Sequence, residues 1–434
     1  MKFVSKAAMA AALAVGVTTA MVATAPTAAA KDKKNDGEKP LELSKEFRTE
    51  AMAAQEAVKA NDIATAKTHL AAAAKLAKSD DEKYFVAALG LPIAAREQDN
   101  AAMKPALQTL IASPRTSDAD RAKYNFYLGQ IALQEKDNEA ALGYLTKAKQ
   151  MGYTDPQLPL MMARVQADTG NTKAGLASLQ EAIAARKASG EEVPESWYKF
   201  GISQAYNGAK DTAATLDWAK QWVTAYPTAQ NWRETIQLFQ QTAQGNAIDD
   251  DARLDLLRLM QQTGSLASQQ DYYEYALLAN KKGLPYETVS VINAGRKAGT
   301  IPADSKNLNE LYSTAQSAIK RDSSLSSLET KAMASANGKL ASQTADAYLA
   351  SGDYQSAIKL YQAALQKGGV DTPVVTSRLA IAQADAGMTT QAEQTFQSVN
   401  ATGGRKDVND LWKLYLSSKG GASAPATSAA STAS

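Results

Sequence analysis

The chain has 434 residues, of which 45% are hydrophobic and 21% charged, so it can bury a core in two or three compact domains or in one extended repeat array. It has no Cys, which excludes disulfides, thiol nucleophiles, zinc fingers and iron–sulfur sites, and its single His excludes His-clustered metal sites. With 47 Lys and Arg against 45 Asp and Glu, it lacks the basic excess of a dedicated nucleic-acid binder.

The first thirty residues have the pattern of a secretory signal. Lys2 and Lys6 precede an apolar stretch of small residues, and Ala28 to Ala30 supply the small side chains of a cleavage site. The alternative is an N-terminal membrane anchor, but the apolar stretch is short and Gly16 interrupts it. No later segment approaches the roughly 18 consecutive apolar residues of a membrane span. We therefore expect removal near Ala30, a periplasmic or secreted location and no integral membrane span.

The mature chain divides by composition into three segments. Residues 31–43 are charged and have the composition of a solvated linker, whereas residues 417–434 are a Ser/Ala-rich tail that we expect to be disordered. Between them, residues 44–416 are rich in Ala, Leu, Gln, Glu and Lys, and apolar residues recur at intervals of three and four. This periodicity predicts an all-α fold.

The predicted helices repeat, most clearly over residues 344–365. Small and large side chains stand at fixed offsets there: Ala345, Tyr348, Gly352, Asp353, Ala357, Tyr361 and Ala364. The small residues allow two antiparallel helices to cross closely, while Gly352 and Asp353 end one helix and begin the next. This spacing resembles the tetratricopeptide repeat (TPR).

The same offsets recur along the chain. Units with this spacing begin at or near Ala54, Gly129, Ala163, Ala276 and Ala380, and Trp197 to Tyr226 fits with a one-residue shift. Residues 81–115, 231–268 and 303–336 have the composition of helix pairs without the small-residue pattern, and residues 407–416 resemble a capping helix. We expect an α-solenoid of eight or nine stacked antiparallel helix pairs, a TPR-like superhelix.

Candidate chemical motifs are weak. Ser-x-x-Lys pairs begin at Ser196, Ser317 and Ser356, all inside predicted helices, and the companion motifs of penicillin-binding enzymes are missing. Residues 249–251 are three Asp that we expect to cap a helix, and His69 is expected to be a partly exposed helical residue. The sequence predicts no catalytic residue, cofactor site or metal site, and hence no enzyme.

A binding surface remains as the candidate functional feature. The resemblance implies that the first helix of each pair lines a concave groove. The family's groove positions fall in this chain on Lys123, Phe126, Gln130, Leu160, Arg164, Tyr198, Ile202, Tyr206, Tyr273 and Leu277. Such a mixed apolar, aromatic and amide floor suits an extended peptide or a partner helix. We expect a protein-interaction scaffold or adaptor of the bacterial cell envelope whose partners are envelope proteins.

Three alternatives stay open at this point. Tyr198, Tyr206, Trp218 and Trp222 fall within one stretch, and aromatic rings there could stack on the sugars of a glycan or hold another solute. An unrecognised pair of carboxylates could make an enzyme, and exposed end repeats could drive self-assembly. The oligomeric state is not readable from the sequence.

Overall fold

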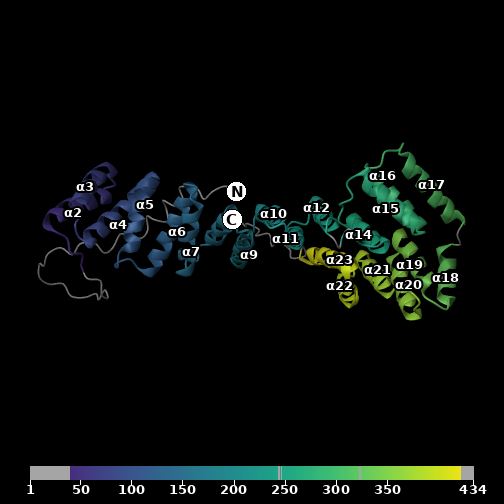
Figure 1. The fold of residues 1–434 in the computed structure, drawn as a ribbon. Coiled ribbons are helices and arrows are strands. Elements are labelled where there is room, and N and C mark those ends of the chain that lie inside the picture. Colours follow the sequence, from purple (N-terminus) through teal and green to yellow (C-terminus); the bar gives the residue numbers. More distant parts are fainter. Residues whose placement is uncertain (1–39, 243–244, 246, 322–323, 422–434) are drawn as a thin grey trace, which may run out of the picture. The chain divides into compact units, whose positions relative to one another are not determined.

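The computed structural model describes residues 40–242, 245, 247–321 and 324–421 (Figure 1). The predicted signal peptide lies outside the described residues, as do most of the predicted linker and residues 422–434. The described residues form 21 α-helices and no β-strand, which confirms the all-α prediction. The chain divides into an N-terminal unit, Met1–Trp197 with Asn207–Ala209, and a C-terminal unit, Tyr198–Tyr206 with Lys210–Ser434.

The N-terminal unit is a series of antiparallel helix pairs, α2/α3, α4/α5, α6/α7 and α8/α9 (Figure 1). Its helices are α2 (Lys45–Lys59), α3 (Ile63–Leu76), α4 (Asp80–Glu97), α5 (Asn100–Ala112), α6 (Asp118–Gln134), α7 (Asn138–Gln150), α8 (Gln157–Asp168) and α9 (Thr172–Ala188). The pair α4/α5 is the helix pair expected over residues 81–115. Helix α10 (Glu195–Ser203) and a π-helical turn (Gln204–Gly208) follow.

The turn inside a pair has a recurring geometry. A residue with positive φ is followed at once by an Asp whose carboxylate accepts a hydrogen bond from the next helix. Asn61 (φ 60) precedes Asp62, which caps α3, and Gly352 (φ 85) precedes Asp353, which caps α20. Glycine adopts this left-handed backbone without the steric cost that other residues incur, and Asp satisfies an otherwise unpaired amide. Both features had been predicted for Gly352 and Asp353.

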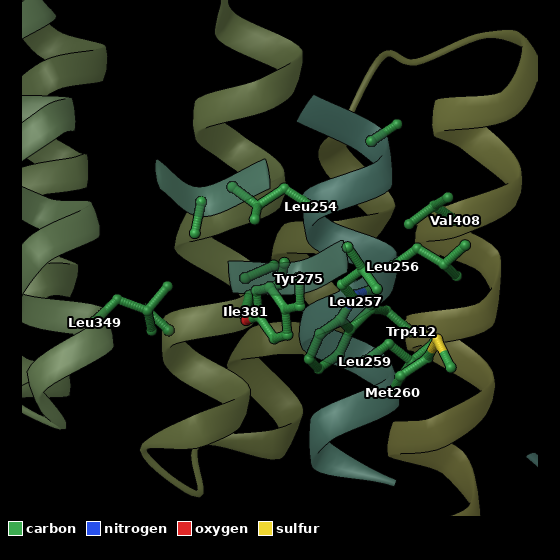
Figure 2. Close-up of a cluster of buried hydrophobic side chains, with 14 of the residues drawn as sticks. Leu254, Leu256, Leu257, Leu259, Met260, Tyr275, Leu349, Ile381, Val408 and Trp412 are labelled. Carbon is green, nitrogen blue, oxygen red and sulfur yellow. The ribbon is translucent and has the colours of Figure 1, made fainter. Parts of the chain in front are cut away.

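The C-terminal unit also contains helix pairs, but they close around one helix. Its helices are α11 (Thr212–Ala225), α12 (Ala229–Gln240), α14 (Asp250–Gln262), α15 (Gln269–Lys281), α16 (Pro285–Lys297), α17 (Lys306–Arg321), α18 (Leu325–Ala334), α19 (Lys339–Ser351), α20 (Tyr354–Lys367), α21 (Thr372–Asp385), α22 (Thr389–Ser398) and α23 (Gly403–Gly421). Helix α14 packs on α15, α21 and α23, although α23 begins more than 100 residues later. Figure 2 shows Trp412 and Val408 of α23 facing Leu256, Leu257 and Met260 of α14.

Where the small-residue pattern exists, the pairs pack as it predicts. Ala345, Ala357 and Ala364 are completely buried where α19 crosses α20, and Tyr361 is buried beside them. In α6/α7 a Cβ added to Gly129 would collide with the Leu145 side chain. Close approach of two helices therefore requires glycine at that position.

The structure corrects two of the pairs expected without that pattern. Helix α12 packs on α11, whereas its expected partner α14 lies against α15, α21 and α23. Helix α17 packs on α15 and α16, and α18 packs on α19 and α20. Helix α16 therefore contacts α19 directly, as the helices of neighbouring repeats do. Helices α17 and α18, which lie between α16 and α19 in the sequence, do not form a repeat with each other.

Both ends of the predicted solenoid also need correction. Glu42, placed in the linker, donates its backbone N–H to Asp81 Oδ2 at 2.8 Å, and Arg115 Nη2 donates to the Pro40 carbonyl at 3.4 Å. These linker residues are therefore bound to the first helix pairs. At the other end α23 continues from the predicted capping segment to Gly421, five residues into the predicted tail.

Candidate functional site

Helices α6 and α8, each the first helix of its pair in the N-terminal unit, carry five of the predicted groove residues. We call the set of side chains Lys123, Tyr127 and Gln130 of α6 and Gln157, Leu160, Met161 and Arg164 of α8 the first-helix face; Tyr127 and Gln130 are buried and the others are half-buried. The spacing of three and four residues places each set on one side of its helix. Lys123 Nζ lies 5.9 Å from the centroid of the Tyr127 ring, a cation–π contact.

Two amide side chains are the distinctive feature of this face. Gln130 Nε2 lies 3.9 Å from Met161 Sδ, which brings α6 and α8 together, and Gln157 stands one turn before Met161 on α8. The Oε1 atoms of Gln130 and Gln157 are buried and accept no hydrogen bond from the described residues. A buried acceptor without a donor costs about 1–3 kcal/mol. An incoming N–H group would recover that free energy once a shift of the neighbouring side chains exposed these oxygens.

Charge and apolar surface flank these amides. Leu160 is half-buried beside Met161, and half-buried Arg164 lies 3.8 Å from Asp168 one turn further along α8. Asp168 therefore partly balances the Arg164 charge.

Two of the aromatic anchors predicted from sequence lie inside the protein. Phe126 is 2% exposed, and its ring centroid lies 4.9 Å from that of Tyr153. Tyr198 is completely buried, with its ring 6.2 Å from that of Tyr226 in an edge-on arrangement. Both rings fill space between helices. Tyr127, one position beyond Phe126, is buried to the same degree at 3% exposed, and its ring contacts Lys123.

Tyr127 is 3% exposed and has two half-buried tyrosine neighbours. Tyr124 and Tyr153 are half-buried, and burial raises the pKa of each phenol to about 12. Burial likewise raises the pKa of Tyr127 above its usual range. These phenols stay protonated at neutral pH and serve as hydrogen-bonding groups.

The remaining predicted positions lie in the C-terminal unit. Ile202 is half-buried and Tyr206 is 53% exposed on the π-helical turn. Tyr273 packs against the core of the unit, whereas Leu277, one turn later on α15, is 41% exposed.

The aromatic stretch considered for glycan binding is mostly internal. Trp218 and Trp222 are 5% and 2% exposed, and Tyr198 is buried with them. The Trp218 ring lies where a Cβ on Gly201 would be, which explains why glycine is needed at that crossing. Of the four rings, Tyr206 alone has a largely exposed surface for stacking.

A buried ion network connects α14 to four other helices of the C-terminal unit, α16, α19, α21 and α23. Arg258 on α14 binds both oxygens of Glu287, at 2.8 and 2.7 Å, and also binds Asp255 at 2.9 Å and Asp346 at 3.2 Å. Arg378 binds Asp346 at 3.0 Å, and Arg405 binds Asp255 at 2.9 Å. Burial alone opposes the charge of Arg258, but Glu287, Asp346 and Asp255 outweigh it and raise the pKa of Arg258.

Neutral donors complete the network. The Tyr275 hydroxyl donates to Glu287 at 2.8 Å, the Tyr361 hydroxyl to Asp346 at 2.7 Å, and Trp412 Nε1 to the Asp255 carbonyl at 2.9 Å. The repeat spacing identified Tyr361 as a packing residue but gave no sign of its polar role. The network was missed because its partners are up to 157 residues apart.

The weak chemical motifs have structural roles. Asp249 caps α14 by accepting a hydrogen bond from the Ala252 N–H at 2.7 Å, as predicted. The Ser356 hydroxyl binds Asp353 at 2.8 Å, while Lys359 pairs with Glu329 at 2.9 Å, so this Ser-x-x-Lys pair is not a catalytic dyad. His69, half-buried as expected, lies 2.7 Å from Glu50.

The described residues lack the arrangements expected of a metal site or a membrane span. They include no group of three or more His, Cys, Asp or Glu side chains placed to hold a metal ion. None of their helices has the length and apolar character needed to span a bilayer.

Comparison with known proteins agrees with the repeat assignment. Residues 343–404, which form α19 to α22, match a tetratricopeptide repeat family. The matched segment includes the unit with the clearest repeat spacing, residues 344–365. No curated protein matches the sequence.

Several solved structures resemble the chain distantly. The TPR2AB domain of yeast Sti1 in its complex with pHSP90 is 14% identical, with a TM-score of 0.23, and the match covers 69% of this chain and 99% of that one. The TPR domain of P58(IPK) is 12% identical, with a TM-score of 0.22, and the match covers 87% and 99%. A tetratricopeptide repeat protein from Parabacteroides merdae is 13% identical, with a TM-score of 0.18, and the match covers 86% and 99%.

Proposed function

We propose that this protein is a non-enzymatic adaptor that binds an extended peptide or a partner helix on the first-helix face. Tetratricopeptide repeats support the broader role of a protein-interaction scaffold. The finer proposal rests on one observation, the buried oxygens of Gln130 and Gln157 that lack donors among the described residues. A peptide supplies backbone N–H groups that match those acceptors.

The rest of the face fits the same kind of ligand. Lys123 and Arg164 offer donors to peptide carbonyls or to acidic side chains, and half-buried Leu160 offers apolar contact. These side chains stand on helices rather than loops, so little ordering cost opposes binding.

We further propose that the protein is exported and that its partners are proteins of the bacterial cell envelope. The positive start, the small apolar stretch and Ala28 to Ala30 support this location. Cell fractionation followed by mass spectrometry of the N-terminus tests it. A mature form beginning near Lys31 in the periplasm or medium is expected, and an intact N-terminus in the cytoplasm would overturn it.

The binding proposal is tested by crosslinking in cells with a tag at the C-terminus. In the variant Gln130→Leu/Gln157→Leu, the unpaired acceptors are replaced by apolar groups, which removes the proposed contacts without leaving new buried polar atoms. The matched control is Gln150→Leu/Gln180→Leu, which makes the same change at exposed positions of the second helices α7 and α9.

We expect an envelope protein to be recovered with the parent and the control and to be lost with the face variant, while circular dichroism shows all three folded. Equal recovery with the face variant, or no enriched protein with the parent, would refute binding at this face.

A further inference from the structure

A cavity of about 220 Å³ lies in the C-terminal unit, partly open to solvent. Its walls come from α14, α15, α16, α19, α20 and α21. Val291 and Leu349 give it an apolar side, and Gln261, Ser290 and Asp385 give it a polar one. Figure 2 shows Tyr275 and Leu349, two of the side chains that line it. The volume is that of a side-chain-sized group and is smaller than a typical drug site.

Three helices end at this cavity. The last residues of α14, α19 and α21 are Gln262, Ser351 and Asp385, and all three line its wall. Each helix C-terminus carries a partial negative charge from carbonyl groups that lack an intrahelical donor. Helix α20 begins here at Tyr354, but Asp353 already caps its N-terminus. These helix ends favour a cation, and the charge of Arg258, which also lines the cavity, is offset by Asp255, Glu287 and Asp346.

Asp385 adds a full carboxylate to this field. Its side chain accepts no hydrogen bond from the described residues, whereas Glu287 on another wall is held by Arg258 and Tyr275. The buried charges of the network already balance without it, because Arg258, Arg378 and Arg405 face Asp255, Asp346 and Glu287. An ionised Asp385 is thus an excess negative charge next to an open space.

The groups that act on Asp385 come from several helices. Burial raises the pKa of Asp385 to about 7, and Glu287 on α16 adds to the rise. Arg258 on α14 and Lys419 on α23 oppose it. The Lys419 ammonium lies over the Tyr415 ring at 4.6 Å. Tyr275 on α15 and Tyr354 on α20 are the titratable phenols of the wall, and burial raises the pKa of each.

We propose that this cavity binds an alkylammonium group, with the ammonium on the Asp385 carboxylate and the alkyl stem along Val291 and Leu349. An ammonium offers three donors, which suits a carboxylate surrounded by amide, hydroxyl and carbonyl oxygens. The apolar wall suits a short methylene chain. The site is separate from the first-helix face and does not depend on the function proposed for it.

The test is calorimetric titration of the full-length protein with n-butylammonium chloride at constant ionic strength. Saturable binding is expected, with n-butanol, the neutral analogue, binding at least about tenfold more weakly because it lacks the charge. Binding requires ionised Asp385, so a pKa of about 7 predicts affinity rising about tenfold from pH 6 to pH 8. The alkylammonium group could belong to a lysine side chain of a protein or to a free amine, and Nα-acetyl-lysine methylamide distinguishes these two sources. Tighter binding than that of n-butylammonium indicates a lysine side chain, and equal binding indicates free amines.

Two variants separate the site from general effects of charge. Asp385→Asn keeps the shape of the side chain and is expected to lower the affinity at least about tenfold. Ser290→Leu leaves Asp385 in place but fills the cavity and is expected to abolish binding. Glu310→Gln, at an exposed position on α17, makes the same charge change away from the cavity and is expected to bind as the parent does.

Absence of saturable binding to the parent at pH 8 would overturn the proposal. So would equal binding of n-butanol, or unchanged affinity in both Asp385→Asn and Ser290→Leu.

Discussion

The two units are built from similar helix pairs but are held together differently. In the N-terminal unit the buried clusters follow the chain from pair to pair, and ion pairs such as Lys104–Glu135 join adjacent pairs at the surface. In the C-terminal unit one core runs from Leu216 to Leu416, and buried ion pairs tie α14 to helices as far away in sequence as α23. Similar local geometry can thus give an array stabilised by neighbours or a closed structure stabilised by distant partners.

The largest expected effect comes from breaking the buried network. Asp255→Asn removes the carboxylate shared by Arg258, Arg378 and Arg405 and leaves buried cations uncompensated. We expect the free energy of unfolding of the C-terminal unit to fall by about 3–5 kcal/mol, measured by urea denaturation. The control is Asp81→Asn, whose partner Arg115 is partly exposed in the N-terminal unit, with an expected loss of about 1 kcal/mol or less. Equal losses would contradict the contrast between the units.

A core truncation in the N-terminal unit should cost nearly as much but act locally. Leu145 is completely buried against Gly129 where α6 crosses α7. Leu145→Ala is expected to cost about 2–5 kcal/mol. Hydrogen exchange should accelerate in α6, α7 and their neighbouring pairs, while α14 to α23 remain protected. Uniform acceleration along the whole chain would show that the N-terminal pairs are not stabilised locally.

The two units should respond to pH in opposite directions through one carboxylate each. A hydrogen bond from the Ser44 hydroxyl, joined by backbone N–H groups, lowers the pKa of Glu82 to about 2, so its contribution to stability is lost as pH falls from about 4.5 to about 2. Burial raises the pKa of Asp385 to about 7, so the folded state binds the proton more tightly than the unfolded chain. Its contribution is greatest below about pH 4 and is lost as pH rises to about 7.

Thermal unfolding across this pH range measures both effects, each limited to about 1.4 kcal/mol per pH unit. Glu82→Gln should reduce the loss of stability of the N-terminal unit as pH falls below about 4.5. Asp385→Asn should reduce the loss of stability of the C-terminal unit as pH rises from about 4 to about 7. Unchanged slopes in the variants would mean that other groups carry the pH dependence.

The smallest effect is expected from the surface ion pairs that join successive pairs of the N-terminal unit. Lys67–Glu97, Lys104–Glu135 and Lys149–Glu181 are 2.6 to 2.8 Å apart, and their side chains are 38–52% exposed. Each Lys→Ala change is expected to cost about 0–1 kcal/mol, and less in 1 M salt. A loss well above this range would mean that these surface ion pairs stabilise the N-terminal unit as strongly as the buried network stabilises the C-terminal unit.

Local rules explain which parts of the fold could be predicted. The spacing from Ala345 to Ala364 predicted α19 and α20 because close helix crossings admit only small side chains and because turns need Gly352 and Asp353. Neither rule determines which helices pack together when they are far apart in the sequence. The sequence therefore did not predict that α14 lies against α23, or that α16 meets α19 directly.

The candidate site was partly predictable for a related reason. Consecutive residues on a helix point about 100° apart. A small difference in helix orientation therefore decides which aromatic residue lies on the same side of α6 as Lys123 and Gln130. The Phe126 ring contacts Tyr153 and the Tyr127 ring contacts Lys123, and both rings are buried. The unsatisfied oxygens of Gln130 and Gln157 could not be predicted at all, because they depend on what the neighbouring helix fails to offer.

The ion pair between Asp255 and Arg405 has a consequence for the order of folding. The two residues are 150 positions apart, so at synthesis rates of about 5–20 residues per second Asp255 waits roughly 8–30 s for Arg405 to be made. Helix pairs of the N-terminal unit close over short loops and can form as they are completed. Helix α14 has no such option, because α23, the last described helix, completes its surroundings. A chain shortened before α23 should therefore keep its early repeats while leaving α14 exposed as an apolar, acidic helix.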